Sequence, residues 1–237
     1  MIPKVIHYCW FGREPMPELA QKCIESWHRK MPDWEYVLWN EDNFDISSFS
    51  YSQEAYEAKK YAFVSDVARL KALNDFGGIY LDVDFEVYKP FDELLRNSAF
   101  AGFEGSKYNP VMMGVLGSEA HGEWVSSQLE RYRDRHFLLQ DGPDLTTNVK
   151  FVSDDMVRHG FLPNGQEQVF MDLHIYPVDF FCPRLTTGEY RRTYNTYCEQ
   201  KSDRSSWAAF TFKDRLFRLF PVGFRAFLIK TKRFLFG

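Results

Sequence analysis

The clearest hydrophobic pattern in the chain lies between residues 61 and 84. Apolar side chains recur there every three or four residues, at Phe63, Val67, Leu70, Leu73 and Phe76. This is the period of one face of an α-helix, so the sequence predicts a helix over 61–76 that the Gly77-Gly78 pair ends. The compact apolar run at 79–81 follows and predicts a short strand.

The first third of the chain alternates strand-like and helix-like segments. Apolar runs predict strands at 4–10 and 36–39, and residues 40–50 are predicted to form a polar loop. Between the strands, residues 18–30 have amphipathic helical spacing, with predicted inward positions at Leu19, Cys23, Ile24 and Trp27. Such alternation is typical of an α/β fold with a mostly parallel central sheet flanked by helices, and 237 residues suit one such domain.

The pattern continues more irregularly beyond residue 84. Strands are predicted at 85–88, 99–104 and 109–117, and in the last of these Gly114 or Gly117 would let a ligand approach closely. A surface helix is expected over 121–137, a second helix with Asp144 as its N-cap, and a short strand region within 166–176.

Charge is unevenly distributed along the chain. The formal net charge is −4, but residues 212–237 carry seven Lys or Arg and one Asp, a net +6, which leaves −10 for residues 1–211. This aromatic, basic tail is predicted to be amphipathic and to bind the anionic surface of a membrane. Packing of the tail on the sheet is the alternative, although Pro221 and Gly223 interrupt any single long helix. Nucleic acid is not an expected partner, because the body is acidic.

The cysteines indicate a reducing compartment, and the hydropathy pattern predicts no membrane-spanning segment. Cys9, Cys23, Cys182 and Cys198 are widely spaced and form no Cys-x-x-Cys pair, so we expect free thiols. The sequence opens on a strand-like segment and has no stretch of 18 uncharged apolar residues. We therefore expect a cytoplasmic protein, held peripherally on the inner face of the cell membrane through its tail.

Two pairs of charged residues frame the candidate chemistry. Asp82 and Asp84 follow the predicted strand, and ligands of open α/β sheets bind at that edge. Two carboxylates there suit one divalent cation. Asp66 and Arg69 stand three residues apart on the preceding helix, where they either face a polar pocket or form a purely structural ion pair.

These residues resemble the core motif of a known family. Ser65-Asp66-x-x-Arg69, the lead-in Gly77 to Leu81 and Asp82-x-Asp84 look like the core of family 32 glycosyltransferases, the "DXD" sugar-binding transferases of capsule and surface-polysaccharide loci. The core is also similar to that of the large clostridial glucosylating toxins. Residues 2–12 resemble the first strand and loop of the bacterial members.

The resemblance implies a GT-A-like fold over residues 1–211 and a specific chemistry. It implies a retaining hexosyltransferase that uses a UDP-sugar donor with Mn²⁺ or Mg²⁺, and a lipid-linked saccharide or glycan as acceptor in bacterial surface polysaccharide synthesis. The catalytic residues would be Asp66, Arg69, Asp82 and Asp84, with metal ligands Asp82, Asp84 and Ser206. The donor would be held by Tyr8, Trp10, Tyr61, Ser65, Asp66, Arg69, Asp82, Ser206 and Trp207.

One departure from the family pattern and one motif shared with another class keep alternatives open. The histidines of the family's usual final motif are absent, and Cys198 to Lys201 stand in their place, so the third protein ligand could be Ser206 or water. A non-catalytic nucleotide-sugar binder is therefore one alternative. A haloacid-dehalogenase-type phosphatase also places Asp-x-Asp after a strand, but it requires Thr or Val where this chain has Glu86.

Overall fold

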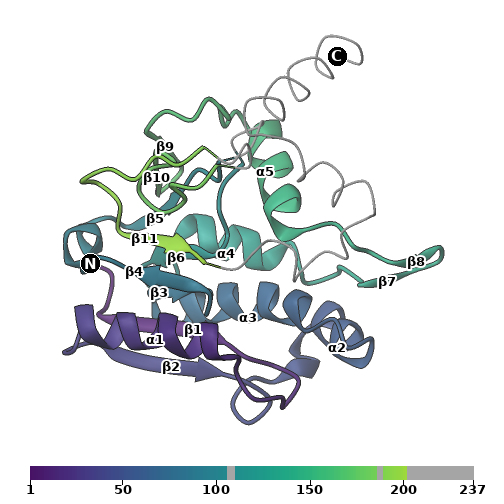
Figure 1. The fold of residues 1–237 in the computed structure, drawn as a ribbon. Coiled ribbons are helices and arrows are strands. Elements are labelled where there is room, and N and C mark those ends of the chain that lie inside the picture. The colour runs from purple at the N-terminus through teal and green to yellow at the C-terminus, as the bar shows by residue number, and fades with distance from the viewer. Residues whose placement is uncertain (106–109, 186–188, 202–237) are drawn as a thin grey trace.

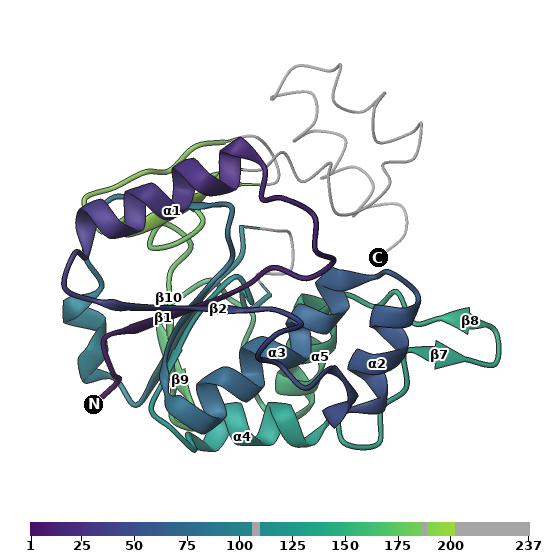
Figure 2. The same cartoon turned by 90° about the horizontal axis from the view of Figure 1, so that it is seen from below.

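The computed structural model describes residues 1–105, 110–185 and 189–201. Over these ranges the chain forms a central seven-stranded sheet with helices on both faces (Figures 1 and 2). In spatial order the strands are β2 (Glu35–Trp39), β1 (Val5–Cys9), β3 (Gly78–Leu81), β6 (Val115–Ser118), β5 (Ala99–Gly102), β10 (Leu173–Tyr176) and β9 (Gln168–Phe170). β6 and β9 run opposite to the other five. The predicted α/β fold with a mostly parallel sheet is confirmed.

The helices divide between the two faces of the sheet, as Figure 2 shows. Their bounds are α1 (Glu18–Lys30), α2 (Ser50–Glu57), α3 (Tyr61–Phe76), α4 (Glu123–Glu130) and α5 (Asn148–Arg158), with short 3₁₀ helices at Ile46–Ser48 and Asp92–Arg96. α1 covers one face, and α3 and α4 cover the other. Because successive strand residues point to opposite faces, Tyr80 joins the core under α3 while Ile79 and Leu81 join the core under α1.

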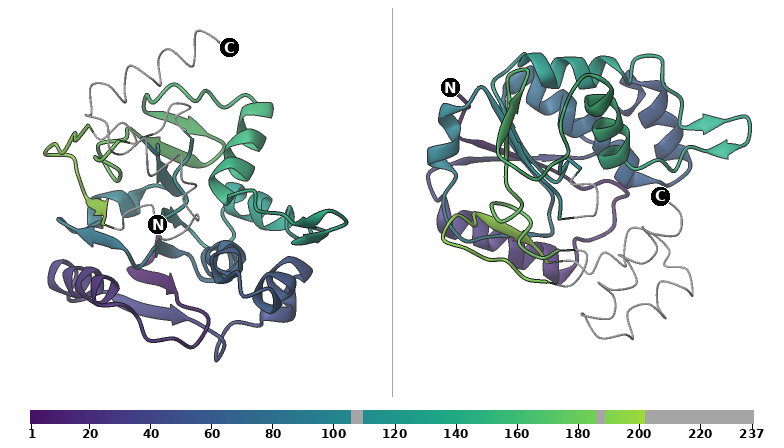
Figure 3. Two further views of the ribbon diagram at one scale, coloured as in Figure 1. Left: turned by 45° about the vertical axis from the view of Figure 1, so that its right-hand side comes forward. Right: turned by 90° about the horizontal axis from the view of Figure 1, so that it is seen from above.

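Two small antiparallel pairs lie outside the central sheet. β4 (Phe85–Val87) pairs with β11 (Cys198–Gln200), which brings residues far apart in sequence together beside the turn that joins β3 to β4. β7 (Leu138–Leu139) and β8 (Gly142–Pro143) form a hairpin that projects from the body of the protein (Figure 3). Within the described ranges, none of the helices combines the length and the apolar character that crossing a bilayer would need.

The central prediction is confirmed, to the residue for the helix and to within one residue for the strand. α3 spans Tyr61–Phe76, and it ends at Gly77, whose positive φ of 65° lets its N–H bond to the carbonyl of Leu73. β3 follows immediately and is buried along its length. The strands predicted at 4–10, 85–88 and 99–104 are present with slightly shorter bounds, and the strand predicted at 36–39 begins one residue earlier.

Several helix predictions were wrong in detail. Leu19 is 41% exposed, because α1 turns Ala20, Cys23, Ser26 and Trp27 inward instead. The region expected to be a polar loop gives way to α2 at Ser50, and α4 ends at Glu130 rather than near residue 137.

The expectations for a later cap and for two glycines also need correction. Thr147, and not Asp144, caps α5, since its hydroxyl accepts the N–H of Lys150. The Phe100 ring fills the space beside Gly117, so this glycine serves packing rather than ligand approach. The tail at 212–237, Ser206 and Trp207 lie outside the described residues.

Candidate functional site

The two motif aspartates lie on a tight turn at the carboxyl end of β3, where the chain passes into β4. The N–H of Asp82 donates to the carbonyl of Gly114 at 2.9 Å, and the N–H of Phe85 donates back to the carbonyl of Asp82 at 3.1 Å. On the other side, the indole N–H of Trp27 donates to the carbonyl of Phe85 at 2.6 Å. The sheet and α1 thus fix both ends of the turn.

Arg69 is the centre of the buried polar cluster below this turn. Its Nη2 lies 3.0 Å from Asp66 Oδ1, and its Nη1 lies 3.6 Å from Asp82 Oδ1. Nη1 also donates to the carbonyl of Met113 at 2.5 Å, and Nε donates to the carbonyl of Ser65 at 3.2 Å. One guanidinium therefore links α3, the strand end and the segment before β6, a fork of contacts that a lysine could not reproduce.

Tyr80 completes the support of Asp82. Its hydroxyl donates to Asp82 Oδ1 at 2.7 Å, and the guanidinium of Arg69 lies 4.5 Å from its ring centroid. A side chain at Gly114 would crowd this carboxylate, since a Cβ there would lie 2.8 Å from Asp82 Oδ2. The side chain of Asp82 is nevertheless 31% exposed, so the carboxylate is anchored on its inner side and accessible from solvent.

The charges of the cluster are set by burial. Burial raises the pKa of Asp66 to about 7, and the like charge of Asp82 adds to the increase, although Arg69 opposes it. For Arg69, burial alone would lower the pKa, but Tyr80, Asp82 and Asp66 outweigh it and raise the pKa. The guanidinium therefore stays charged, and Asp66 can hold or release a proton near neutral pH.

Asp84 is held by contacts from the strand β11 instead. Its side chain is buried, and Oδ2 accepts a hydrogen bond from Nε2 of Gln200 at 3.0 Å. The N–H of Lys201 donates to the backbone carbonyl of Asp84 at 2.8 Å. Asp82 is thus anchored by α3 and β3, whereas Asp84 is anchored by the β11 strand.

The loop after β1 lies beside the first turn of α3. Gly12 has a positive φ of 102°, and a Cβ there would overlap the ring of Tyr61. The N–H of Gly12 donates to Glu41 Oε1 at 2.6 Å, which ties the loop down. Trp10 is half-buried and donates to the carbonyl of Glu14 at 2.5 Å.

Not all predicted site residues converge. Ser65, Asp66, Arg69 and Asp82 form one contact network, and Tyr61 packs on the neighbouring loop. Tyr8 instead lies on the α1 side, edge-on to Trp27 with ring centroids 5.5 Å apart. The donor-binding roles of Tyr8, Trp10, Tyr61 and Ser65 stay predictions.

Two residues of the site were missed from the sequence. Tyr80 lies on β3 two positions before Asp82, which directly follows the strand, so strand alternation continued by one residue predicts both on the same face and could have identified Tyr80. Gln200 lies 116 residues from Asp84 and carries no local signal.

The residues present suit a divalent cation bound with its substrate. In the described ranges, no group of three or more His, Cys, Asp or Glu side chains is arranged to hold a metal ion. Asp82 and Asp84 offer two carboxylates at one turn, and Mg²⁺ in particular is often held by one or two carboxylates together with substrate phosphates and water. The two carboxylates are therefore suitable ligands for Mn²⁺ or Mg²⁺, and no third acidic side chain is required.

Comparison with known proteins adds independent findings. Residues 17–101 match the family described as "Glycosyltransferase sugar-binding region containing DXD motif". Inositol phosphoceramide mannosyltransferase 1 of Schizosaccharomyces pombe is 32% identical over 106 residues, which is 42% of this chain and 33% of that protein. Inositol phosphoceramide mannosyltransferase 2 of the same yeast is 32% identical over 183 residues, 69% of this chain and 49% of that protein. The chain thus spans a third to a half of these curated relatives.

Among solved structures, mouse xyloside xylosyltransferase 1 is similar at 11% identity, with a TM-score of 0.47 over 85% of this chain and 98% of that one. A likeness at this level is too weak to assign a fold, which the described strands and helices establish directly. The family match and the named relatives agree with the glycosyltransferase resemblance, while the likeness to capsule-locus members and to clostridial toxins stays a prediction. The matched segment and the named relatives support a glycosyltransferase family for this chain.

Proposed function

We propose that this chain is a metal-dependent, retaining glycosyltransferase of the GT-A type. It transfers a hexose or N-acetylhexosamine from a UDP-sugar to a lipid-linked or glycan acceptor, as in bacterial surface polysaccharide synthesis. The observation that carries this proposal is the turn after β3, where Asp82 lies against the buried Asp66–Arg69 pair and Asp84 lies beside it. The matched "DXD" segment, residues 17–101, supports the same function.

The chain's own residues bind and orient the sugar donor and its metal ion. A divalent cation bound at Asp82 and Asp84 would neutralise charge on the leaving diphosphate. Arg69 is buried and already uses Nε, Nη1 and Nη2 in contacts within the protein. It therefore holds Asp66 and Asp82 in place and contributes fixed positive charge, and is less suited to wrapping around the donor. Asp66 accepts from a donor hydroxyl once it is ionised.

The donor nucleotide has two candidates. The family resemblance favours a UDP-sugar, whereas two of the named relatives are inositol phosphoceramide mannosyltransferases, which favours testing GDP-mannose beside it. The names of those relatives also describe sugar transfer to a ceramide lipid, which agrees with a lipid-linked acceptor. Such an acceptor would lie at the inner face of the cell membrane, where the basic tail at 212–237 would hold the protein peripherally.

Nucleotide release tests the proposal. Wild-type protein with Mn²⁺ is incubated with UDP-glucose, UDP-galactose, their N-acetylated forms and GDP-mannose, beside Asp82→Asn. We expect slow release of the nucleotide from one donor, lost in the variant and on chelation of the metal. Protection of the fold by a donor without any nucleotide release would favour the non-catalytic binder instead. No protection and no release with any donor would contradict both.

A further inference from the structure

The C-terminal strand of the described chain lies directly against the proposed metal-binding motif. β11 pairs antiparallel with β4 in the register Cys198 to Val87, Glu199 to Glu86 and Gln200 to Phe85. The pairing continues one step further, because the N–H of Lys201 donates to the carbonyl of Asp84 at 2.8 Å. The backbone of Asp84 is therefore part of this small sheet.

Glu199 anchors the strand from inside. Its side chain is 1% exposed, and its carboxylate accepts from the hydroxyls of Tyr88 at 2.7 Å and Tyr190 at 2.8 Å and from Nη2 of Arg184 at 3.0 Å. Burial works to raise the pKa of Glu199, but these hydrogen bonds outweigh it and lower the pKa. Glu199 is thus a buried, ionised and well-satisfied group, and such a group fixes the position of β11.

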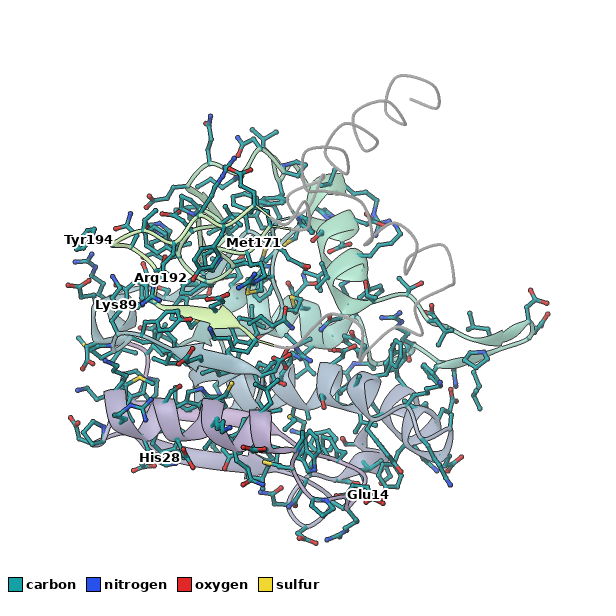
Figure 4. The ribbon with its side chains drawn as sticks, viewed as in Figure 1. Glu14, His28, Lys89, Met171, Arg192 and Tyr194 are labelled. Carbon is teal, nitrogen blue, oxygen red and sulfur yellow. The ribbon has the colours of Figure 1, made fainter. Side chains whose placement is uncertain are left out.

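Contacts between cations and aromatic rings stabilise the other side of the layer formed by β4, β11 and the segment 189–197. The ammonium of Lys89 lies 3.8 Å from the ring centroid of Tyr197, and the guanidinium of Arg192 lies 3.8 Å from that of Tyr88. Lys89, Arg192 and Tyr194, labelled in Figure 4, lie close together beside β11. The layer is held at both ends, so Gln200 is presented to Asp84 from a fixed backbone.

We propose that Gln200 is a positioning residue that orients the carboxylate of Asp84 for metal binding. The side-chain N–H of Gln200 donates to Asp84 Oδ2 at 3.0 Å, and the ionised carboxylate can only accept. This bond restricts rotation of the carboxylate about the side-chain bonds of Asp84. Groups that hydrogen-bond to metal ligands in this way commonly change metal affinity about 10- to 100-fold when they are removed. The inference rests on the proposed metal-dependent function.

Gln200→Met tests the assignment because it keeps the length and flexibility of the side chain and removes the donor. Because the two carboxylates are expected to hold the metal together with nucleotide phosphates, Mn²⁺ binding to the full chain is measured by titration calorimetry with UDP or GDP present, after subtraction of a protein-free titration. The melting temperature is measured without metal. Two variants are matched controls. Gln168→Met removes a side-chain amide at the far edge of the central sheet, and Tyr190→Phe removes one bond to Glu199 without touching Asp84.

We expect Gln200→Met to bind Mn²⁺ about 10-fold more weakly or worse, with both controls binding like wild type. Its metal-free melting temperature should fall by only a few degrees, because a buried carboxylate oxygen loses its donor. If the Met variant does not fold, Gln200→Asn, which is one methylene too short to reach Asp84, should show the same loss. Mn²⁺ binding equal to wild type in the folded variant would overturn the role of Gln200 and leave the proposed function standing. An equal loss in Tyr190→Phe would assign the effect to the layer as a whole and overturn it too. No Mn²⁺ binding by wild type would overturn both this inference and the metal-dependent function.

Discussion

Replacing Arg69 with methionine should destabilise the protein in a way that depends on pH. The substitution keeps an unbranched side chain but leaves Asp66 and Asp82 without their shared cation and the carbonyl of Met113 without its donor. Breaking a buried ion pair by removing one partner typically costs about 3–5 kcal/mol. For a chain of this size that is a fall in melting temperature of roughly 6–20 °C.

The pH dependence follows from Asp66. Its pKa is raised to about 7 by burial and by Asp82, while Arg69 and, to a smaller extent, Arg135 lower it. Without Arg69, Asp66 of the native variant keeps its proton above pH 7, where native wild type loses it. In both unfolded chains the carboxyl is already ionised, because its ordinary pKa is 3.8. Because the native variant then binds more protons, its stability falls faster with rising pH, and the deficit should grow by about 1.4 kcal/mol between pH 6 and pH 8.

Urea unfolding at pH 6 and pH 8 measures both quantities, and Asp66→Asn supplies the control background. In that background the loss from Arg69→Met should no longer change with pH, because no titrating group remains at position 66. A deficit below about 1 kcal/mol, well under the usual cost of breaking a buried pair, would refute the proposed coupling of the two residues. So would a deficit that grows equally with pH in the Asp66→Asn background.

Three further predictions concern the surroundings of the site. His7 donates from Nε2 to the carbonyl of Gly77 and accepts at Nδ1 from Trp39, and burial lowers its pKa. Its contribution to stability is therefore present above about pH 6.5 and is lost on acidification. Urea unfolding of wild type should show an acid loss of up to about 1.4 kcal/mol per pH unit that His7→Gln lacks, and identical profiles would contradict this. The side chain of Gly12→Val meets both a positive φ and the Tyr61 ring, so the free energy of unfolding should fall by about 1–3 kcal/mol. Gly160→Ala, at a positive φ with open space around it, should cost less, and equal losses would show that the Tyr61 contact does not matter. Deleting residues 212–237 should abolish co-sedimentation with anionic vesicles, while unchanged sedimentation would assign membrane binding elsewhere.

The sequence predicts the centre of this protein better than its edges. Residues 61–84 carry a complete local signal, a helical period, a glycine stop and a short apolar strand, and the structure follows it. The inward position of Leu19 was wrong because two adjacent faces of α1 are apolar enough to be buried, and only contact with β4 selects the face that includes Trp27.

The site was predictable as far as it is local. Asp66, Arg69 and Asp82 follow from helix spacing and from the end of a strand, and these residues do meet. The contact between Asp84 and Gln200 is set by a strand pairing across 116 residues, and the three-residue strand 198–200 is too short to show an alternating pattern. Only tertiary packing supplies that information.

The most direct test of the account is donor-dependent stabilisation of wild type beside Asp84→Ala. Melting temperatures are recorded with and without Mn²⁺ for UDP-glucose, UDP-galactose, their N-acetylated forms and GDP-mannose. One donor should raise the melting temperature of wild type only when Mn²⁺ is present, and Asp84→Ala should show no such shift relative to its own ligand-free melting temperature. A donor shift that is independent of metal, or that persists in Asp84→Ala, would contradict the claim that this turn holds a metal-bound nucleotide sugar.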